Sequence, residues 1–383
     1  MPRALLAFEP PDGGVADHVG ALAHGLPAHG WEVEVAGPTS ASIYDSLRAA
    51  GVAVHAIDPL ARGYGRPWRD YRAGSQLGSL LDDGGFDLLH CHSTKAGLVG
   101  RLVGRRRGAK VIYTPNCFAW VGEVPGWRRA VAPPVERALG RSTDKLICVA
   151  EAERREALEH RIAHRSALEL VYNGSSPCES FAASPFPDDG RPLVAAISVL
   201  RRQKRLDVLI EAAPLILAAV PETRIAIVGE GPEEAALRAK LASMDAAVRE
   251  AVEMMPFVPP SARYLNALDV FVLCSSWEAF PIAVLEALAC GVPQVCTDVG
   301  GTAEALTEET GIVIPPRSPR ALADAVVDLL RDPERRARMS AAGRARHAAL
   351  FTQERVVAET AAVYERALHS APAPATPGAG ARG

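Results

Sequence analysis

Two successive series of short apolar runs, separated by longer amphipathic segments, constrain the fold of this chain more than any other feature. Such alternation is typical of repeated βα units, in which parallel strands are joined by helices. Each series therefore predicts one doubly wound parallel sheet in an α/β fold. The strands expected in the first sheet are residues 4–8, 32–36, 52–57, 88–91, 110–114 and 145–149, and those in the second are residues 193–199, 224–228, 270–274, 294–297 and 311–314.

The length of 383 residues suits two domains of roughly 150 residues each. A stretch rich in Pro, Ser and Gly separates the two series and predicts a linker. The expected parts are a first lobe (1–174), the linker (175–192), a second lobe (193–350), a C-terminal helix that packs back on the first lobe (351–369) and a disordered low-complexity tail (370–383).

Composition excludes some classes of protein. The net charge of -3 and the pI near 6.4 lack the basic character that nucleic-acid binding usually needs, so we expect no nucleic-acid partner. The N-terminal apolar run is too short for a signal peptide, and no stretch is long enough to span a membrane. The cysteines are odd in number, scattered and without a C-x-x-C pair, which favours buried thiols in a reducing compartment over a disulfide framework or a zinc site. We therefore expect a cytoplasmic protein.

The segment that follows the expected strand at residues 270–274 carries two carboxylates. Glu278 falls in a turn and Glu286 on the helix that Pro281 is placed to begin. The free backbone N–H groups of residues 280–283 would favour a bound diphosphate at the helix N-terminus. The carboxylates can accept hydrogen bonds from paired sugar hydroxyls; alternatively, Glu278 only complements the helix dipole and Glu286 is a solvated helix residue.

The run from Glu278 to Glu304 resembles the E-x7-E signature and the following Gly-Gly loop of retaining glycosyltransferase family 4. This resemblance implies the GT-B fold, in which two Rossmann-like lobes face a central cleft. It also implies that Glu278 contacts the donor sugar and that Glu286 holds the ribose hydroxyls. The other donor contacts implied around this turn are Ala279, Phe280, Pro281 and Ile282.

Further segments along the chain resemble the same family. Residues 171–174 resemble its hinge signature, and the loop containing Gly229 resembles the one after a strand of its C-terminal lobe. In the run 200–207, Lys204 falls on the lysine that grips the diphosphate, where a cation would stabilise the leaving group in place of a metal. The family arginine would fall on Val199, so either Arg201 or Arg202 reaches the phosphate instead, or both are solvated loop charges.

The first lobe offers weaker signals. Gly13 and Gly14 link the first strand to a helix, where backbone can approach a ligand closely; in the resembled family this loop lies against the donor phosphates and the acceptor. His92 and Lys95 align with a segment on the acceptor side. Residues 113–117 align with a family stretch that usually reads Thr-x-His-Gly. Asn116 replaces its histidine, so any role it keeps is positioning, because an amide takes up no proton near neutral pH.

Metal binding is not expected. His90 and His92 are two residues apart without further ligands, and His160 and His164 lack an H-E-x-x-H pattern. Two basic clusters, residues 101–110 and 126–129, leave two interpretations open: a solvated face, or contact with an anionic membrane surface or a phosphorylated acceptor. At most, we expect peripheral association with a membrane.

The resemblance implies an enzyme of the hexosyltransferase type that moves a sugar from a nucleotide diphosphate donor, first of all a UDP-sugar, to an acceptor hydroxyl. The expected reaction retains the anomeric configuration and needs neither metal nor cofactor, with Lys204, Glu278, Arg201 and Asn116 as catalytic candidates. The acceptor is a small molecule or a lipid-linked precursor. Two alternatives stay open: a GT-B epimerase or phosphorylase, and a non-catalytic nucleotide-sugar-binding protein, which Val199 and Asn116 would suit.

Overall fold

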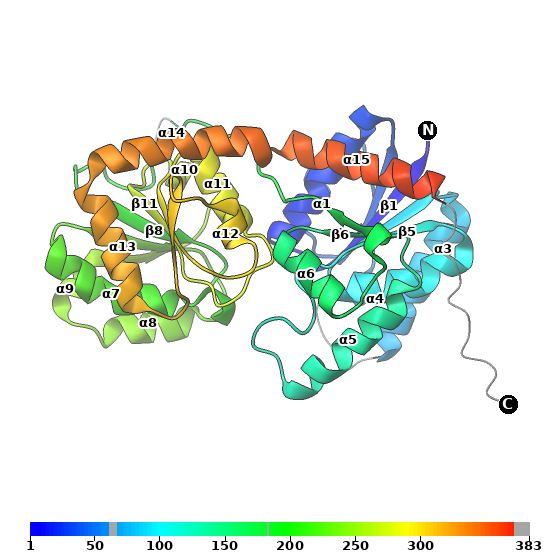
Figure 1. The fold of residues 1–383 in the computed structure, drawn as a ribbon, viewed down its shortest axis with the longest axis horizontal. Coiled ribbons are helices and arrows are strands. Elements are labelled where there is room, and N and C mark those ends of the chain that lie inside the picture. Colours follow the sequence, from blue (N-terminus) through cyan, green and yellow to red (C-terminus); the bar gives the residue numbers. More distant parts are fainter. Residues whose placement is uncertain (61–66, 182–183, 371–383) are drawn as a thin grey trace. The chain divides into compact units, whose positions relative to one another are not determined.

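The computed structural model describes residues 1–60, 67–181 and 184–370. The chain divides into two compact units: unit 1 comprises Met1–Val171 and the segment from Val356 onward, and unit 2 comprises Tyr172–Arg355. Each unit holds one sheet of parallel strands between helices (Figure 1), which confirms the predicted α/β fold. The predicted tail lies, apart from Ser370, outside the described residues.

The sheet of unit 1 has seven parallel strands in the order β3-β2-β1-β4-β5-β6-β7. Its strands are β1 (Arg3–Phe8), β2 (Glu32–Gly37), β3 (Ala53–Ala56), β4 (Leu88–His92), β5 (Lys110–Thr114), β6 (Lys145–Cys148) and β7 (Leu168–Leu170). Its helices are α1 (Gly14–Gly25), α2 (Tyr44–Ala49), α3 (Pro67–Gly84), α4 (Thr94–Gly104), α5 (Gly126–Gly140), α6 (Glu151–Glu159) and α15 (Gln353–His369), with short 3-10 turns η1 (Leu26–His29), η2 (Asp58–Leu60), η3 (Arg105–Arg107) and η4 (Arg165–Ala167).

The sheet of unit 2 has six parallel strands in the order β10-β9-β8-β11-β12-β13. Its strands are β8 (Leu193–Ile197), β9 (Arg224–Val228), β10 (Val252–Met255), β11 (Val270–Leu273), β12 (Gln294–Thr297) and β13 (Gly311–Ile314). Its helices are α7 (Leu206–Ala219), α8 (Glu234–Ala242), α9 (Ala246–Ala251), α10 (Ala262–Leu265), α11 (Ile282–Cys290), α12 (Thr302–Ala305), α13 (Pro319–Arg331) and α14 (Pro333–Leu350), and the 3-10 turn η5 (Arg202–Lys204) precedes α7.

Strand β1 shows why its apolar run is continuous rather than alternating. Leu6 belongs to the core that α1, α2 and α15 cover, whereas Leu5 belongs to the core on the opposite face, which α3 and α4 cover. A strand between two helical layers needs apolar side chains on both faces, so its sequence reads as one apolar run. The same reasoning holds for β8, whose five residues are all buried.

The sequence did not predict two strands, β7 and β10, and both lie at an edge of their sheet. All three residues of β7 are half-buried, and only Val252 of β10 is buried. An edge strand has one neighbour and a partly solvated surface, so its apolar run is too short to stand out.

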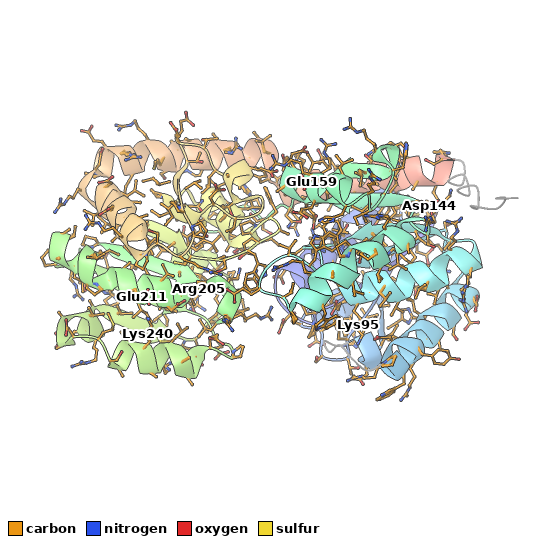
Figure 2. All side chains as sticks on the ribbon, turned by 60° about the horizontal axis from the view of Figure 1, so that its bottom comes forward. Lys95, Asp144, Glu159, Arg205, Glu211 and Lys240 are labelled. Carbon is orange, nitrogen blue, oxygen red and sulfur yellow. A yellow bond between two sulfur atoms is a disulfide. The ribbon has the colours of Figure 1, made fainter. Side chains whose placement is uncertain are left out.

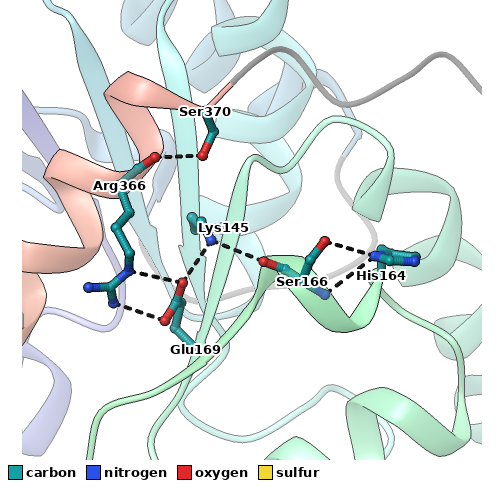
Figure 3. A network of polar contacts seen from close by, with 6 residues as sticks. All are labelled: Lys145, His164, Ser166, Glu169, Arg366 and Ser370. Carbon is teal, nitrogen blue, oxygen red and sulfur yellow. Dashed lines mark hydrogen bonds and ion pairs between the residues drawn. The ribbon is translucent and has the colours of Figure 1, made fainter.

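Helix α15 packs on unit 1 through buried and polar contacts. The ring of Tyr364 stacks edge-on against Trp31, with 5.0 Å between centroids, and its hydroxyl lies 2.7 Å from Nδ1 of His90. At the edge of the sheet, Glu169 of β7 joins Arg366 of α15 at 2.9 Å and Lys145 of β6 at 2.7 Å (Figure 3). The C-terminal helix is therefore part of the core of unit 1.

One expectation about the cysteines is wrong. Cys178 and Cys290 form a disulfide that ties the segment after residue 172 to the C-terminal end of α11. The two residues are 112 positions apart in sequence, and such pairs cannot be recognised from spacing alone. The other five cysteines are free, and four of them are buried: Cys91, Cys148, Cys274 and Cys296.

Replacing Tyr364 by Phe tests the docking of α15. The change removes the hydroxyl partner of a fully buried imidazole, so we expect unit 1 to lose about 1–3 kcal/mol of stability. Tyr71→Phe is the matched control, because Tyr71 is 79% exposed and should tolerate the change. Urea denaturation of both variants checks this, and equal midpoints would contradict the assigned role.

Candidate functional site

The order of strands in unit 2 indicates where its sheet would bind a ligand. Strands β8 and β11 are neighbours, but the chain leaves them towards opposite sides, to β9 and to β12. In an open parallel sheet, ligands bind outside the carboxyl ends of two such strands, where the loops diverge. The two loops here are residues 198–205 and 274–281, and they contain half of the predicted donor residues, including Lys204 and Glu278.

Lys204 and Glu278 join these two loops. Nζ of Lys204 lies 2.6 Å from Oε1 of Glu278, and the side chains are 20% and 10% exposed. The hydroxyl of Ser275 also donates to Oε1 at 2.6 Å, and the amide of Gln203 donates to Oε2 at 3.2 Å. The carboxylate is thus fixed by three side chains, while the ammonium can donate up to three hydrogen bonds. The cation and anion implied by the resemblance lie together.

Glycines let the loops around this pair approach closely. A Cβ at Gly300 would lie 2.0 Å from the carbonyl oxygen of Glu278, and Gly301 N–H donates to the carbonyl of Ala279 at 2.8 Å. A Cβ at the predicted Gly229 would lie 1.9 Å from the carbonyl oxygen of Ser198. Both glycines have positive φ, so backbone conformation and space exclude other residues.

Helix α11 begins one residue later than the sequence predicts. Pro281 is the N-cap residue rather than the first helical residue, and Ile282 starts the helix. Phe280 is buried between Tyr172 and Phe351, and its carbonyl accepts a hydrogen bond from Asn173 at 3.1 Å. These contacts fix the turn that leads into the helix N-terminus, the position predicted for a diphosphate. Glu286 lies on α11 and is half-buried.

The departure at Val199 is visible in the structure. Val199 is 36% exposed and follows the end of β8. Arg201 is half-buried at the start of η5, and Arg202 is exposed. Arg201 and Lys204 are close along the chain, because Lys204 N–H donates to the carbonyl of Arg201 at 2.9 Å. Of the two arginines, the half-buried Arg201 is the better candidate to replace the family arginine that would fall on Val199.

In unit 1, the corresponding strands are β1 and β4. Gly13, with φ 77°, is the N-cap residue of α1, which begins at Gly14. The buried carboxylate of Glu9, just after β1, accepts a hydrogen bond from Lys95 N–H at 2.8 Å and so caps α4. Nζ of Lys95 is buried and lies 3.1 Å from Asp70 of α3. The cation predicted for the acceptor side is therefore engaged within its own lobe.

Three histidines gather behind these loops. The ring of His92 lies 3.9 Å from that of His90 and 5.4 Å from that of His18, centroid to centroid. Neither ring nitrogen of the fully buried His92 has a hydrogen-bond partner. Burial lowers the pKa of all three, that of His18 to about 4, so they are neutral at pH 7.

The loop after β5 has an unusual backbone. Asn116 has φ 52° and Cys117 has φ 100°. The buried carboxyl of Glu153 holds this loop, because it accepts N–H bonds from Cys117 at 2.8 Å and from Val149 at 2.9 Å. Burial raises the pKa of Glu153 to about 7.

Sequence reasoning missed four residues that position this chemistry: Ser275, Gln203, Glu9 and Glu153. Ser275 and Gln203 adjoin predicted residues, so their position in the motif was the available signal. Glu153 lies 36 residues from Cys117, and no pattern connects them. Within the described ranges, no group of three or more His, Cys, Asp or Glu side chains is arranged to hold a metal ion.

Comparison with known proteins identifies the two units. Residues 179–346 match the family "Glycosyl transferases group 1", and residues 13–174 match "Glycosyl transferase 4-like domain". The D-inositol 3-phosphate glycosyltransferase of Thermobispora bispora is 29% identical over 314 residues, covering 76% of this chain and 73% of that one.

Two solved structures have the same fold. Sucrose-phosphate synthase from Thermosynechococcus elongatus superposes with a TM-score of 0.80 at 20% identity, covering 95% of this chain and 98% of that one. Anabaena Alr3699/HepE in complex with UDP and glucose has a TM-score of 0.80 at 16% identity, covering 96% and 100%. Together, these matches show that the chain belongs to the group 1 glycosyltransferases of the GT-B fold, enzymes of the hexosyltransferase type. None of the helices in the described part of the chain combines the length and the uncharged apolar composition of a membrane span.

Replacing Gly300 by Ala tests whether the loops must approach this closely. The added Cβ would collide with the Glu278 carbonyl, so we expect affinity for UDP to fall by at least about tenfold, or about 1.4 kcal/mol. Gly190→Ala is the control, because Gly190 also has positive φ (72°) but has no atom near a Cβ. Calorimetry compares them, and equal affinities would mean that the contact does not shape the site.

Proposed function

We propose that this enzyme transfers a hexosyl group from a UDP-sugar to an acceptor hydroxyl, with retention of configuration and without a metal ion. The observation that carries the proposal is the Lys204–Glu278 ion pair, which lies just beyond the carboxyl ends of β8 and β11. An open parallel sheet binds its ligand at this position. The choice of UDP is supported by the related structure solved with UDP and glucose. Retention is supported by the E-x7-E spacing of Glu278 and Glu286.

Lys204 has the chemistry that the leaving group requires. In the reaction, the bond from the anomeric carbon to the phosphate oxygen breaks, the acceptor oxygen bonds to that carbon, and the acceptor proton passes to the departing phosphate. Negative charge then grows on the diphosphate, and a fixed ammonium next to it lowers the barrier. The N-terminus of α11, with its free N–H groups, would add partial positive charge on the same anion.

The two glutamates would accept hydrogen bonds from the hydroxyl groups of the donor, which lie on its sugar and its ribose. One carboxylate oxygen of Glu278 accepts hydrogen bonds from Lys204 and Ser275, and the other accepts one from Gln203. The carboxylate is therefore oriented before the sugar arrives. We assign Glu278 to binding the sugar hydroxyls, and we assign Glu286, which lies on α11, to binding the ribose hydroxyls. Arg201 is proposed as the second phosphate cation.

The acceptor is assigned to the carboxyl edge of the sheet of unit 1. We propose that Asn116 contacts the acceptor from a loop with a constrained backbone. The buried side chains of His92 and Lys95 are proposed to help shape the acceptor pocket. Gly13 and Gly14 are proposed to bring the start of α1 close to the ligand. The proposed cytoplasmic location fits the five free cysteines, whereas the Cys178–Cys290 disulfide would have to form against a reducing environment.

Calorimetric titration of UDP, GDP, ADP and dTDP in excess EDTA tests the donor site. We expect UDP alone to bind well, and Glu286→Ala to weaken its binding by about tenfold or more because the ribose hydroxyls lose a charged acceptor. Binding that required a divalent metal would contradict the proposal. Binding of UDP-sugar without transfer or donor hydrolysis would instead favour a non-catalytic binding protein, and turnover that needed inorganic phosphate would favour a phosphorylase.

Kinetics of Lys204→Ala test the role of the cation. We expect kcat to fall by about 100-fold or more while the KM for donor changes much less, because the charge that Lys204 stabilises grows in the transition state. Lys240→Ala is the matched control: it removes a lysine from an ion pair with Glu211 between α7 and α8 in the same unit (Figure 2). Equal losses in kcat and donor affinity would remove the proposed role.

A further inference from the structure

Helix α5 exposes a continuous apolar face to solvent. Trp127, Val131 and Val135 follow one another at intervals of four residues and are 67%, 50% and 42% exposed. By helical spacing, Ala130, Pro134 and Ala138 share this face, and all three are exposed. The opposite face packs inward through Pro133, Glu136 and Leu139. We call the six exposed residues the outer face of α5.

An apolar face with helical period normally faces a core. Single exposed apolar side chains are ordinary, whereas a contiguous set that includes a tryptophan marks a surface with a partner. The core of unit 1 does not use this face, because its buried clusters contain neither Trp127 nor Val131. The pattern of α5 therefore serves something outside unit 1.

Arginines border the outer face. Arg128 and Arg137 lie on its two sides in helical projection. Arg129 and Arg137 donate to the backbone carbonyls of Gly122 and His160, at 3.1 and 2.9 Å, so these contacts leave their charges in place. The whole chain has a net charge of -3, so this positive charge is a local feature.

More arginines lie beside the C-terminal end of α5. The guanidinium of Arg105 donates to the carbonyl of Arg141, which places the exposed turn η3 (Arg105–Arg107) next to that end. The two basic clusters of the sequence thus lie at opposite ends of α5, with residues 126–129 at its start and η3 beside its end. Three members of the cluster at residues 101–110 are engaged elsewhere: Arg101 is fully buried, Arg107 pairs with Asp82 at 2.8 Å, and Lys110 pairs with Asp144 at 3.4 Å.

The inward face explains how α5 holds this position. Arg101 of α4 pairs with Glu136 of α5 at 2.7 Å, with 0% and 5% of the side chains exposed, and its guanidinium stacks 3.8 Å from the ring centre of Tyr113. Glu136 is the single acidic residue in α5. Because it points inward, the helix presents apolar and cationic side chains outward.

We propose that the outer face of α5 docks unit 1 onto an anionic lipid bilayer. The apolar stripe would enter the boundary between headgroups and acyl chains, and the arginines would lie against the phosphates. Trp127 at one end suits this boundary, since its ring is apolar and its N–H can remain hydrated. A stripe one helix wide, with cations along its borders, complements a planar anionic surface better than it complements a folded protein.

Co-sedimentation of the full chain with vesicles tests the proposal. We expect binding to vesicles of equal parts phosphatidylglycerol and phosphatidylcholine, and little binding to phosphatidylcholine alone. The triple variant Trp127→Ser, Val131→Ser, Val135→Ser should bind more than about tenfold less tightly. Leu215→Ser, Phe257→Ser, Val258→Ser is the matched control in unit 2, where these side chains are 39%, 38% and 49% exposed, and it should bind normally.

A charge variant separates the electrostatic part. Arg128→Glu with Arg137→Glu should lose at least about fivefold per arginine, and added salt should weaken the binding of the parent chain. The proposal is overturned if the parent chain does not bind anionic vesicles at low salt, or if the triple variant binds as the control does. A dimer that the triple variant dissociates, without vesicle binding, would overturn it in favour of a second copy.

This proposal stands apart from the proposed function. Vesicle binding requires neither donor nor turnover, and none of the substituted residues belongs to the donor site. Urea denaturation of each variant checks that unit 1 is folded, and UDP titration checks the donor site of unit 2. A chain that binds UDP but not vesicles would refute the docking surface alone.

Discussion

The ion pair between Lys204 and Glu278 depends on the order in which the strands of unit 2 are connected. Only because β8 and β11 are neighbours whose following loops diverge can residues 74 positions apart meet at 2.6 Å. Gly300 lets the next loop press against Glu278, and Ser275 fixes its carboxylate. A half-buried charge is stable only with its partner, so the pair also holds the two loops next to each other.

Unit 1 repeats this topology with different chemistry. Its divergent loops follow β1 and β4, but Lys95 is turned to Asp70, and the histidines behind the loops are neutral because burial lowers their pKa. The two units therefore share one strand order and differ in the side chains that follow their central strands.

How much could be predicted from the sequence depended on the range of the interactions involved. The central strands were recognisable because burial on both faces demands continuous apolar runs, whereas the edge strands β7 and β10 left no such pattern. Glu278 and Lys204 were recognisable from local motifs. The disulfide of Cys178 with Cys290 was not, because it depends on a contact across 112 residues that only the folded chain creates.

The loop after β5 departs from the family pattern and has a backbone that other residues hold in place. Cys117 stands where the family stretch has glycine, yet its φ of 100° is a glycine-like conformation, which costs a residue with a Cβ about 1–3 kcal/mol. Glu153 helps to hold it through a buried hydrogen bond. A chain that maintains a strained turn without glycine indicates that the position of the preceding residue matters. Asn116, with φ 52° in this held loop, can form hydrogen bonds but takes up no proton near neutral pH, which fits the positioning role proposed for it.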